Sequence, residues 1–272
     1  GSVVTYGKAG VGVVATQSFV NPSFGPRGIS LLENGLTPKL AVKTLLELDE
    51  SREVRQLAIL DAYGNVEAFT GINCIDEAGH IVGNNFSVQA NLMDKNTVWP
   101  AMAEAFKNAK GSLAERMLAA MEAAQKEGGD IRGKQSAAIL IVKAKSTGNS
   151  WEDNIVDLRI EDNENPILEL KRLLTIHTAY EFMNKGDLAV ETGDNTLAKE
   201  HYMNAQKLNP DNLEMKYWFA ITLANNGELN EAKKILKEIF KQNSKWKELT
   251  PRLVKPKLLT ISEKQLQEIL NL

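Results

Sequence analysis

Cysteine and histidine are scarce in this chain of 272 residues, which has one cysteine and three histidines. The single cysteine, Cys74, excludes a framework of internal disulfides. Zinc sites need several Cys and His ligands, and Cys74 with the nearby His80 supplies too few. No apolar run approaches the roughly 20 residues of a membrane-spanning helix. We therefore predict neither a metal site nor a membrane span, and the compartment stays open.

Charge is nearly balanced over the whole chain, which has a formal net charge of −3, but it is unevenly distributed. Residues 1–170 hold 22 acidic and 16 basic side chains, whereas residues 171–272 hold 13 acidic and 16 basic ones. Most of the basic excess follows Lys233. No cluster of arginines and aromatic residues indicates a nucleic-acid partner. The basic stretch is typical of a solvated helix face, and a docking surface for an acidic partner is the alternative.

Two glycine-rich motifs share letters with nucleotide-binding signatures but lack their context. The run Gly128-x-x-x-x-Gly133-Lys134 has Gln135 where a P-loop needs Ser or Thr, and it enters a strand instead of a helix. The run Gly10-Val-Gly-Val-Val-Ala15 continues as β sequence where a dinucleotide-binding fold needs a helix. We therefore predict no cofactor.

Residues 1–170 group strands with strands and helices with helices. Strands are expected over 11–17, 54–61, 66–70, 86–91, 136–143 and 154–160, and helices over 30–48, 101–108 and 113–126. The first helical stretch is expected to divide at Gly35, with Thr37 as N-cap and Pro38 at the first helical position. The unbroken apolar run after Ser136 indicates a strand buried on both faces. This order predicts a layered α+β domain over residues 1–170.

Residues 171–272 contain an internal repeat. Gly186, Gly193, Ala198, Tyr202 and Ala205 recur 34 residues later as Ala220, Gly227, Ala232, Leu236 and Ile239. The period and pattern resemble the tetratricopeptide repeat over about residues 180–245. Ala189 stands where that family usually has a larger aromatic residue, which predicts a shallow groove. A helix over 167–183 and a last helix entered at Ser262, with Gln265 in capping-box position, are expected to flank the repeats.

The charged turn before the apolar strand is the strongest candidate for chemistry. Asp130, Arg132 and Lys134 lie within five residues at the entrance of a predicted strand. Such a cluster can lower the pKa of a neighbouring amine or nucleophile. A structural ion pair that fixes the turn is the alternative. Gln135 and Ser136 follow directly and are included as candidate substrate contacts.

Four other polar residues are candidates for substrate binding. Asn21 and Arg27 lie in a loop with two prolines and two glycines, Asn21–Gly28, which is expected to be rigid enough to hold a site. Gln89 and Asn91 share one face of a predicted strand with Ser87, where a core ladder and a pocket lining are both consistent with the pattern. His80 is a further candidate, with a structural histidine as its alternative.

Several motifs occur in order along about residues 1–175. They are Ala9-Gly-Val-Gly-Val-Val-Ala-Thr-Gln17, Asn21-Pro, Gly25-Pro-Arg-Gly28, Arg52-Glu-Val-Arg-Gln56, Phe69-Thr-Gly71, Ala78-Gly-His80, Val88-Gln-Ala-Asn91 and Gly129-Asp with Arg132-Gly-Lys-Gln-Ser136. The series resembles domain-of-unknown-function family 1028. The resemblance implies an N-terminal-nucleophile-hydrolase-like fold, which is a four-layer αββα sandwich, here without its first strand.

Enzymes of that fold attack an amide carbonyl with a Thr, Ser or Cys at the free N-terminus. The family usually begins further upstream, so the first strand and the nucleophile are expected before Gly1, and Ser2 matches an internal position. The resemblance thus implies a hydrolase of small-molecule amides. Asp130, Arg132 and Lys134 would surround the nucleophile, and His80, Gln89 and Asn91 would lie near the substrate.

The rival hypothesis is a non-catalytic module that binds a ligand or a protein and carries the helical repeats as an interaction domain. A nucleophilic residue at the mature N-terminus of the complete protein would favour the enzyme. Association of copies is also expected, because a sandwich without one strand exposes a pairing edge. A peptide or protein partner is expected at the repeats if their concave surface is used.

Overall fold

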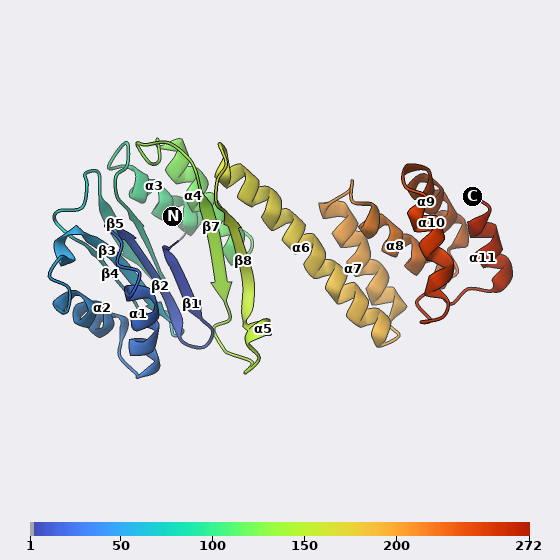
Figure 1. Ribbon diagram of the computed structural model, residues 1–272, viewed down its shortest axis with the longest axis horizontal. Coiled ribbons are helices and arrows are strands. Elements are labelled where there is room, and N and C mark those ends of the chain that lie inside the picture. Colours follow the sequence, from blue (N-terminus) through green and yellow to red (C-terminus); the bar gives the residue numbers. More distant parts are fainter. Residues whose placement is uncertain (1–2) are drawn as a thin grey trace. The chain divides into compact units, whose positions relative to one another are not determined.

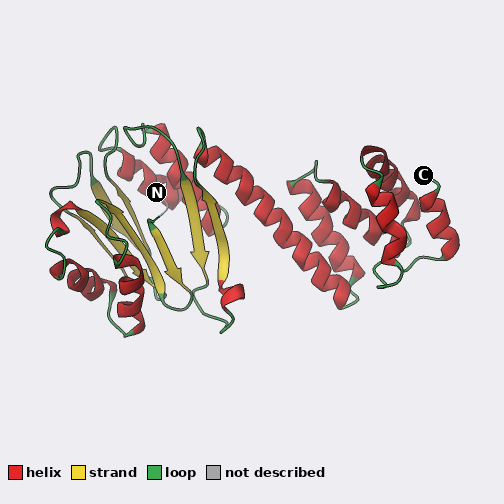
Figure 2. Ribbon diagram, viewed as in Figure 1, coloured by secondary structure: helices red, strands yellow, loops and turns green. Residues whose placement is uncertain are grey.

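The computed structural model describes residues 3–272, which form two compact units, Gly1–Arg172 and Leu173–Leu272. The first unit mixes helices and strands, and the second is helical (Figures 1 and 2). No helix among the described residues is long and apolar enough to cross a membrane.

The first unit contains a four-stranded antiparallel sheet in the order β1-β2-β3-β4. Its strands are β1 (Thr5–Lys8), β2 (Gly12–Ser18), β3 (Arg55–Asp61) and β4 (Val66–Thr70). Helices α1 (Phe24–Glu33) and α2 (Pro38–Glu47) pack on one face, where Phe24, Leu45 and Ile59 are fully buried. This core lies between the helices and the alternate residues of β2 and β3 that point toward them.

Two further strand pairs belong to this unit. Strands β5 (Gly79–Gly83) and β6 (Phe86–Ala90) form one antiparallel pair, and β7 (Ala137–Val142) and β8 (Asn154–Ile160) form the other, with a register shift at Ile141 and Val142. Helix α3 (Val98–Asn108) packs on β5 and β6, and its neighbour α4 (Leu113–Lys126) contacts β7. The pair β5–β6 lies against β4 and β3, whereas β7 lies against β1. Helices α3 and α4 thus pack on each other, whereas the strands beneath them form two separate pairs, and β6 does not pair with β7.

Most predicted elements of the first unit are present, with three corrections. The stretch Asn21–Gly28 is not wholly a loop, because α1 begins at Phe24. Pro26 is tolerated in the first turn of α1, because the backbone N–H groups of a first turn have no partner within the helix. Strands β1 and β5 were not expected, because β1 has only four residues and because Gly79 and Gly83 at the ends of β5 hide its short apolar pattern. Strand β7 alternates buried and half-buried residues, so it is not buried on both faces.

The end of the first unit and all of the second are mainly helical. The helices are α5 (Ser150–Asp153), α6 (Pro166–Glu191), α7 (Asn195–Leu208), α8 (Leu213–Asn225), α9 (Leu229–Gln242), α10 (Lys245–Leu249) and α11 (Glu263–Leu270), with short 3₁₀ helices η1 (Arg52–Val54) and η2 (Thr250–Leu253). The predicted capping box at Ser262 and Gln265 is confirmed.

The repeated small residues lie where the helices of the second unit approach one another. Ala198, Ala220 and Ala232 are fully buried, and Tyr202 is 2% exposed. A Cβ atom built on Gly186 would lie 2.5 Å from the Tyr202 ring, so only glycine fits there without a shift of that ring. The small residues of the repeat therefore allow the helices to pack closely, as the sequence pattern predicted.

Candidate functional site

A buried polar cluster joins the four-stranded sheet to the β5–β6 pair, and Gln56 is its centre. The Gln56 side chain is 0% exposed and lies on the face of β3 opposite to helices α1 and α2. Its Nε2 donates to Thr70 Oγ1 (2.9 Å) and to the carbonyls of Gly79 (3.2 Å) and Ala90 (2.8 Å). Its Oε1 accepts from Gln17 Nε2 (2.8 Å) and Asn91 Nδ2 (3.0 Å). The Gln56 side chain thus bonds to partners on four strands, β2, β4, β5 and β6, and to Asn91, the residue after β6.

The same cluster extends to His80 through Thr70. Thr70 Oγ1 accepts from Gln56, so its own proton is available for His80 Nδ1, which lies 2.8 Å away. A neutral imidazole that accepts at Nδ1 carries its proton on Nε2. Burial lowers the pKa of His80, with a smaller opposite effect from Glu67. With Thr70 as the donor to Nδ1, His80 presents an Nε2–H, and its lowered pKa favours the neutral form near pH 7.

A small polar cavity of about 340 Å³ lies beside His80. It is lined by residues of β4, the β4–β5 loop, β5 and α3, among them Thr70, Cys74, Asp76, His80 and Trp99. Trp99 packs so closely over Gly79 that a Cβ there would lie 2.6 Å from its ring. The cavity thus combines an N–H donor, a carboxylate and an aromatic wall, which can bind a small polar group.

Titration of His80 tests the chain of hydrogen bonds that runs from Gln56 through Thr70 to His80. We expect the pKa of the His80 imidazole in the folded protein to lie below its ordinary value of 6.5, because burial disfavours the charged form. Because the folded pKa is depressed, the unfolded chain binds the proton first, so stability falls as the pH drops below about 6.5 and levels off below the folded pKa. NMR of the histidine ring resonances over a series of pH values measures the pKa of His80. A Thr70→Val variant, which cannot donate to Nδ1, should lose the single Nε2–H tautomer, and an unchanged tautomer would contradict this chain of hydrogen bonds.

The split in the strand layer forms a larger cavity of about 640 Å³, which we call the β6–β7 groove. Its floor is the face of β2 and β3 that carries Val13 and Leu60, and its walls are β6 and β7. Helices α3 and α4 cover it with apolar side chains. The residues facing it from the helices include Met102, Phe106, Met117 and Met121.

The groove is mainly apolar but has a polar strip on β6. Ser87 and Gln89 both line it, and Ser87 Oγ donates to Gln89 Oε1 over 3.1 Å. Leu140 and Val142 line the opposite wall. Among residues 3–272, β6 pairs only with β5 and β7 only with β8, so each wall has one strand edge without a strand partner. Two such edges on either side of an apolar groove are suited to an extended backbone.

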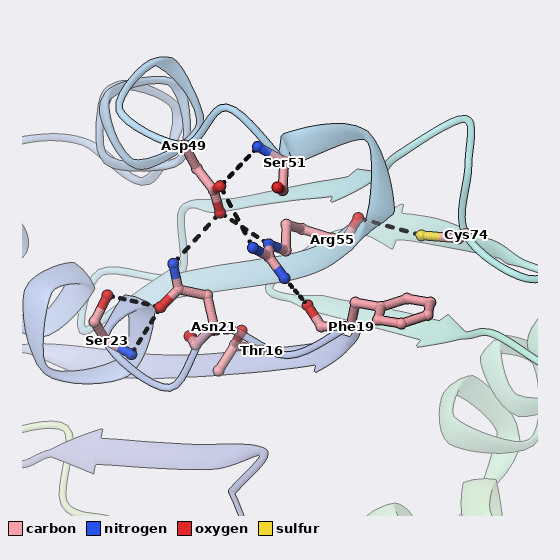
Figure 3. Close-up of polar contacts among 8 residues, drawn as sticks. All are labelled: Thr16, Phe19, Asn21, Ser23, Asp49, Ser51, Arg55 and Cys74. Atoms are coloured by element: carbon pink, nitrogen blue, oxygen red, sulfur yellow. Dashed lines mark hydrogen bonds and ion pairs between the residues drawn. The ribbon is translucent and has the colours of Figure 1, made fainter.

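Asn21 lies in a different network, which Figure 3 shows. Asp49 accepts from Arg55 Nε at 2.8 Å, from the Ser51 amide and from Asn21 Nδ2. Arg55 also donates to the Phe19 carbonyl, and Cys74 Sγ donates to the Arg55 carbonyl. The Arg55 guanidinium holds the pKa of Asp49 below its usual value. The bonds of Asp49 and Arg55 tie the β2–α1 connection to the α2–β3 connection. This arrangement indicates a structural role for the network.

The predicted charged turn is an exposed ion pair in the structure. Arg132 Nη2 lies 2.7 Å from Asp130 Oδ2, and the Arg132 side chain is 72% exposed. This pair lowers the pKa of Asp130. Lys134 is exposed, and Gln135 donates to Asp162 over 3.3 Å. Neither of the two cavities is lined by these residues or by Ser136 or Arg27.

The structure thus brings together His80, Gln56 and Asn91 and places Gln89 in the groove, whereas the Asp130 turn, Arg27 and Asn21 line neither cavity. The Asp130 turn is bonded to the segment just after Asn91, because the Ile131 amide donates to the Leu92 carbonyl over 3.1 Å. Sequence reasoning missed Gln56, Thr70 and Trp99. A polar Gln56 on an otherwise apolar strand was the available signal, because a buried amide must find partners. Among residues 3–272 no group of three His, Cys, Asp or Glu side chains is arranged to hold a metal ion.

Comparisons with known proteins agree with this division of the chain. Residues 1–170 match the model of a family of unknown function, DUF1028, and residues 189–250 match a tetratricopeptide repeat. The chain is similar to the crystal structure of protein SPO2555 from Silicibacter pomeroyi, described as a DUF1028 protein. The two are 32% identical with a TM-score of 0.57, over 63% of this chain and 72% of that chain. No curated protein matches.

Proposed function

Because the chain belongs to the family of unknown function DUF1028, we propose that its first unit is the scaffold of a hydrolase of small-molecule amides. The β6–β7 groove is the observation that carries this proposal. In the proposed enzyme an extended segment from outside residues 1–272 lies in the groove, pairs with both strand edges and completes an αββα sandwich. That segment carries the attacking Thr, Ser or Cys.

Two hydrogen-bond donors, the side chains of Gln89 and His80, support the proposal. Gln89 lines the groove, and His80 stands opposite Gln89 in the β5–β6 register. The side-chain amide of Gln89 and the Nε2–H of His80 are donors of the kind that stabilise the oxygen of an amide under attack. In this proposal Thr70, which accepts from Gln56, donates to His80 Nδ1 and leaves the His80 proton on Nε2. Asp130, Arg132 and Lys134 are proposed to act near the nucleophile, as the family resemblance implies.

The protein expressed from its complete reading frame tests the proposal. We expect intact mass and N-terminal sequencing to give a mature chain that begins with Thr, Ser or Cys, and we expect it to release amine or ammonia from members of a small-amide panel. Gln89→Ala should lower kcat/KM by about 10²-fold, which is the scale for one lost oxyanion donor. The exposed Gln267→Ala, on helix α11 of the second unit, is the matched control. A mature N-terminus of another residue type would leave a non-catalytic binding module instead.

The second unit favours an additional role in binding a protein partner. Its match to the tetratricopeptide repeat covers residues 189–250, and repeats of this kind stack helix pairs into extended binding surfaces. We propose that this role accompanies the first unit's activity and does not replace it.

A further inference from the structure

The small cavity beside His80 has a negatively charged side chain in its lining and no positively charged one. Asp76 lines it, whereas no Lys or Arg does. Among the described residues the exposed Asp76 carboxylate has no ion-pair partner. The charge of Glu67 on β4 also acts on His80, where it opposes the effect of burial on the His80 pKa. Since carboxylates at a concave site attract cations and repel anions, the cavity is suited to a positively charged group.

Trp99 and His80 add two properties that suit an organic cation. Lys107, Arg116 and Lys185 lie over phenylalanine rings, but within the described part of the chain no Lys or Arg lies over the Trp99 ring. An indole ring is the best aromatic partner of an ammonium group. Because burial lowers its pKa, His80 favours the neutral form and does not repel a cation.

A metal ion suits this cavity less well than an ammonium group. Metal ions take about four to eight ligands, and Asp76 is the only carboxylate in the lining. Cys74 Sγ already donates to the Arg55 carbonyl. Residues 3–272 hold no group of three His, Cys, Asp or Glu side chains that is arranged to bind a metal. An ammonium group needs only a carboxylate and an aromatic face.

The cavity adjoins the β6–β7 groove through the pair His80 and Gln89. His80 lines the cavity, Gln89 lines the groove, and the two residues stand opposite each other in the β5–β6 ladder. Residues directly opposite in an antiparallel ladder have Cβ atoms about 5 Å apart. A short molecule can therefore place an amide at this pair and extend its other end into the cavity.

We propose that the cavity binds the ammonium end of the substrate, with Asp76 as its ion-pair partner and Trp99 as its aromatic wall. This inference rests on the proposed amide hydrolase and names its substrate class: small amides that carry a cationic amino group a few carbon atoms from the carbonyl. Asp76 and Trp99 act by binding, so they determine which amide is selected and take no part in the attack on the carbonyl.

Binding of two amides of equal size to residues 1–272 tests the site without turnover. The probes are 4-aminobutanamide, which is a cation at pH 7, and pentanamide, in which a methyl group replaces the ammonium group. NMR titration of the His80 ring and Trp99 indole resonances should show saturable binding of 4-aminobutanamide, and pentanamide should bind at least about tenfold more weakly. Asp76→Asn should raise the dissociation constant of 4-aminobutanamide about tenfold and Trp99→Leu about fivefold.

Asp211→Asn is the matched control, because Asp211 is also exposed but lies in the second unit. It should leave the dissociation constant unchanged, and circular dichroism should show that all variants are folded. Equal binding of the two amides, or an Asp76→Asn variant that binds 4-aminobutanamide like the parent, would overturn the proposal.

The complete protein separates this inference from the proposed hydrolase. Selective binding of 4-aminobutanamide without hydrolysis of any amide would support the ammonium site and remove the proposed activity. Hydrolysis of 4-aminobutanamide and pentanamide with equal kcat/KM would support the activity and overturn the ammonium site. If both proposals hold, Asp76→Asn should lower kcat/KM for 4-aminobutanamide about tenfold and leave that for pentanamide unchanged.

Discussion

Replacing Gln56 by leucine is expected to lower the free energy of unfolding of the first unit by about 4 kcal/mol, because several buried or part-buried polar groups each lose a hydrogen-bond partner. The carbonyls of Gly79 and Ala90 lose the Nε2 donor, and Gln17 and Asn91 lose the Oε1 acceptor. Leucine has nearly the same volume, so the loss measures hydrogen bonding more than packing. Urea unfolding monitored by circular dichroism gives the value.

Two variants separate this explanation from a general sensitivity of the fold. Gln56→Glu keeps the shape but places a second oxygen against two carbonyls, so it should destabilise the unit at least as much at neutral pH. Gln135→Leu removes one exposed amide with a 3.3 Å bond and should cost less than about 0.5 kcal/mol. A cost for Gln56→Leu as small as that of the control would mean that water replaces the lost partners.

Local patterns were sufficient to predict most of the individual elements of this fold. Thr37 followed by Pro38 marked the start of α2, and the Thr37 side chain does accept from the Leu40 amide. Ser112 and Glu115 form a capping box at the start of the predicted helix α4. Such signals act over three or four residues, so they can be read without knowledge of the fold.

The candidate site was harder to predict because its residues are far apart in the sequence. Gln56, Thr70 and Asn91 meet through strand pairing between elements whose register depends on the whole sheet. The Asp130 turn was favoured because three charges adjoin in sequence, and the structure shows that Asp130 and Arg132 mainly bind each other. Charges that are neighbours in the sequence are therefore equally consistent with an ion pair that fixes a turn and with a functional site.

Replacing Arg55 by methionine is expected to cost about 3–5 kcal/mol, because it leaves the carboxylate of Asp49 without its cation in a largely buried position. The side chains of Arg55 and Asp49 are 17% and 11% exposed. Methionine keeps the apolar stem of arginine and removes the bonds to Asp49 and to the Phe19 carbonyl. The exposed Arg132→Met, which also breaks an Arg–Asp pair, is the matched control and should cost less than about 1 kcal/mol.

The pH dependence identifies Asp49 as the group responsible. In the parent protein Arg55 lowers the Asp49 pKa below 3.8, so the stabilisation is complete above that pH and is lost as the pH falls through the folded value. Without Arg55, burial raises the Asp49 pKa, so the deficit of the variant should be largest near pH 7 and should shrink as Asp49 takes up a proton in acid. Adding Asp49→Asn to Arg55→Met should recover at least about half of the loss at pH 7, since no unpaired charge remains. A deficit that is independent of pH, or a double variant as unstable as the single one, would assign the cost to lost packing instead of the buried carboxylate.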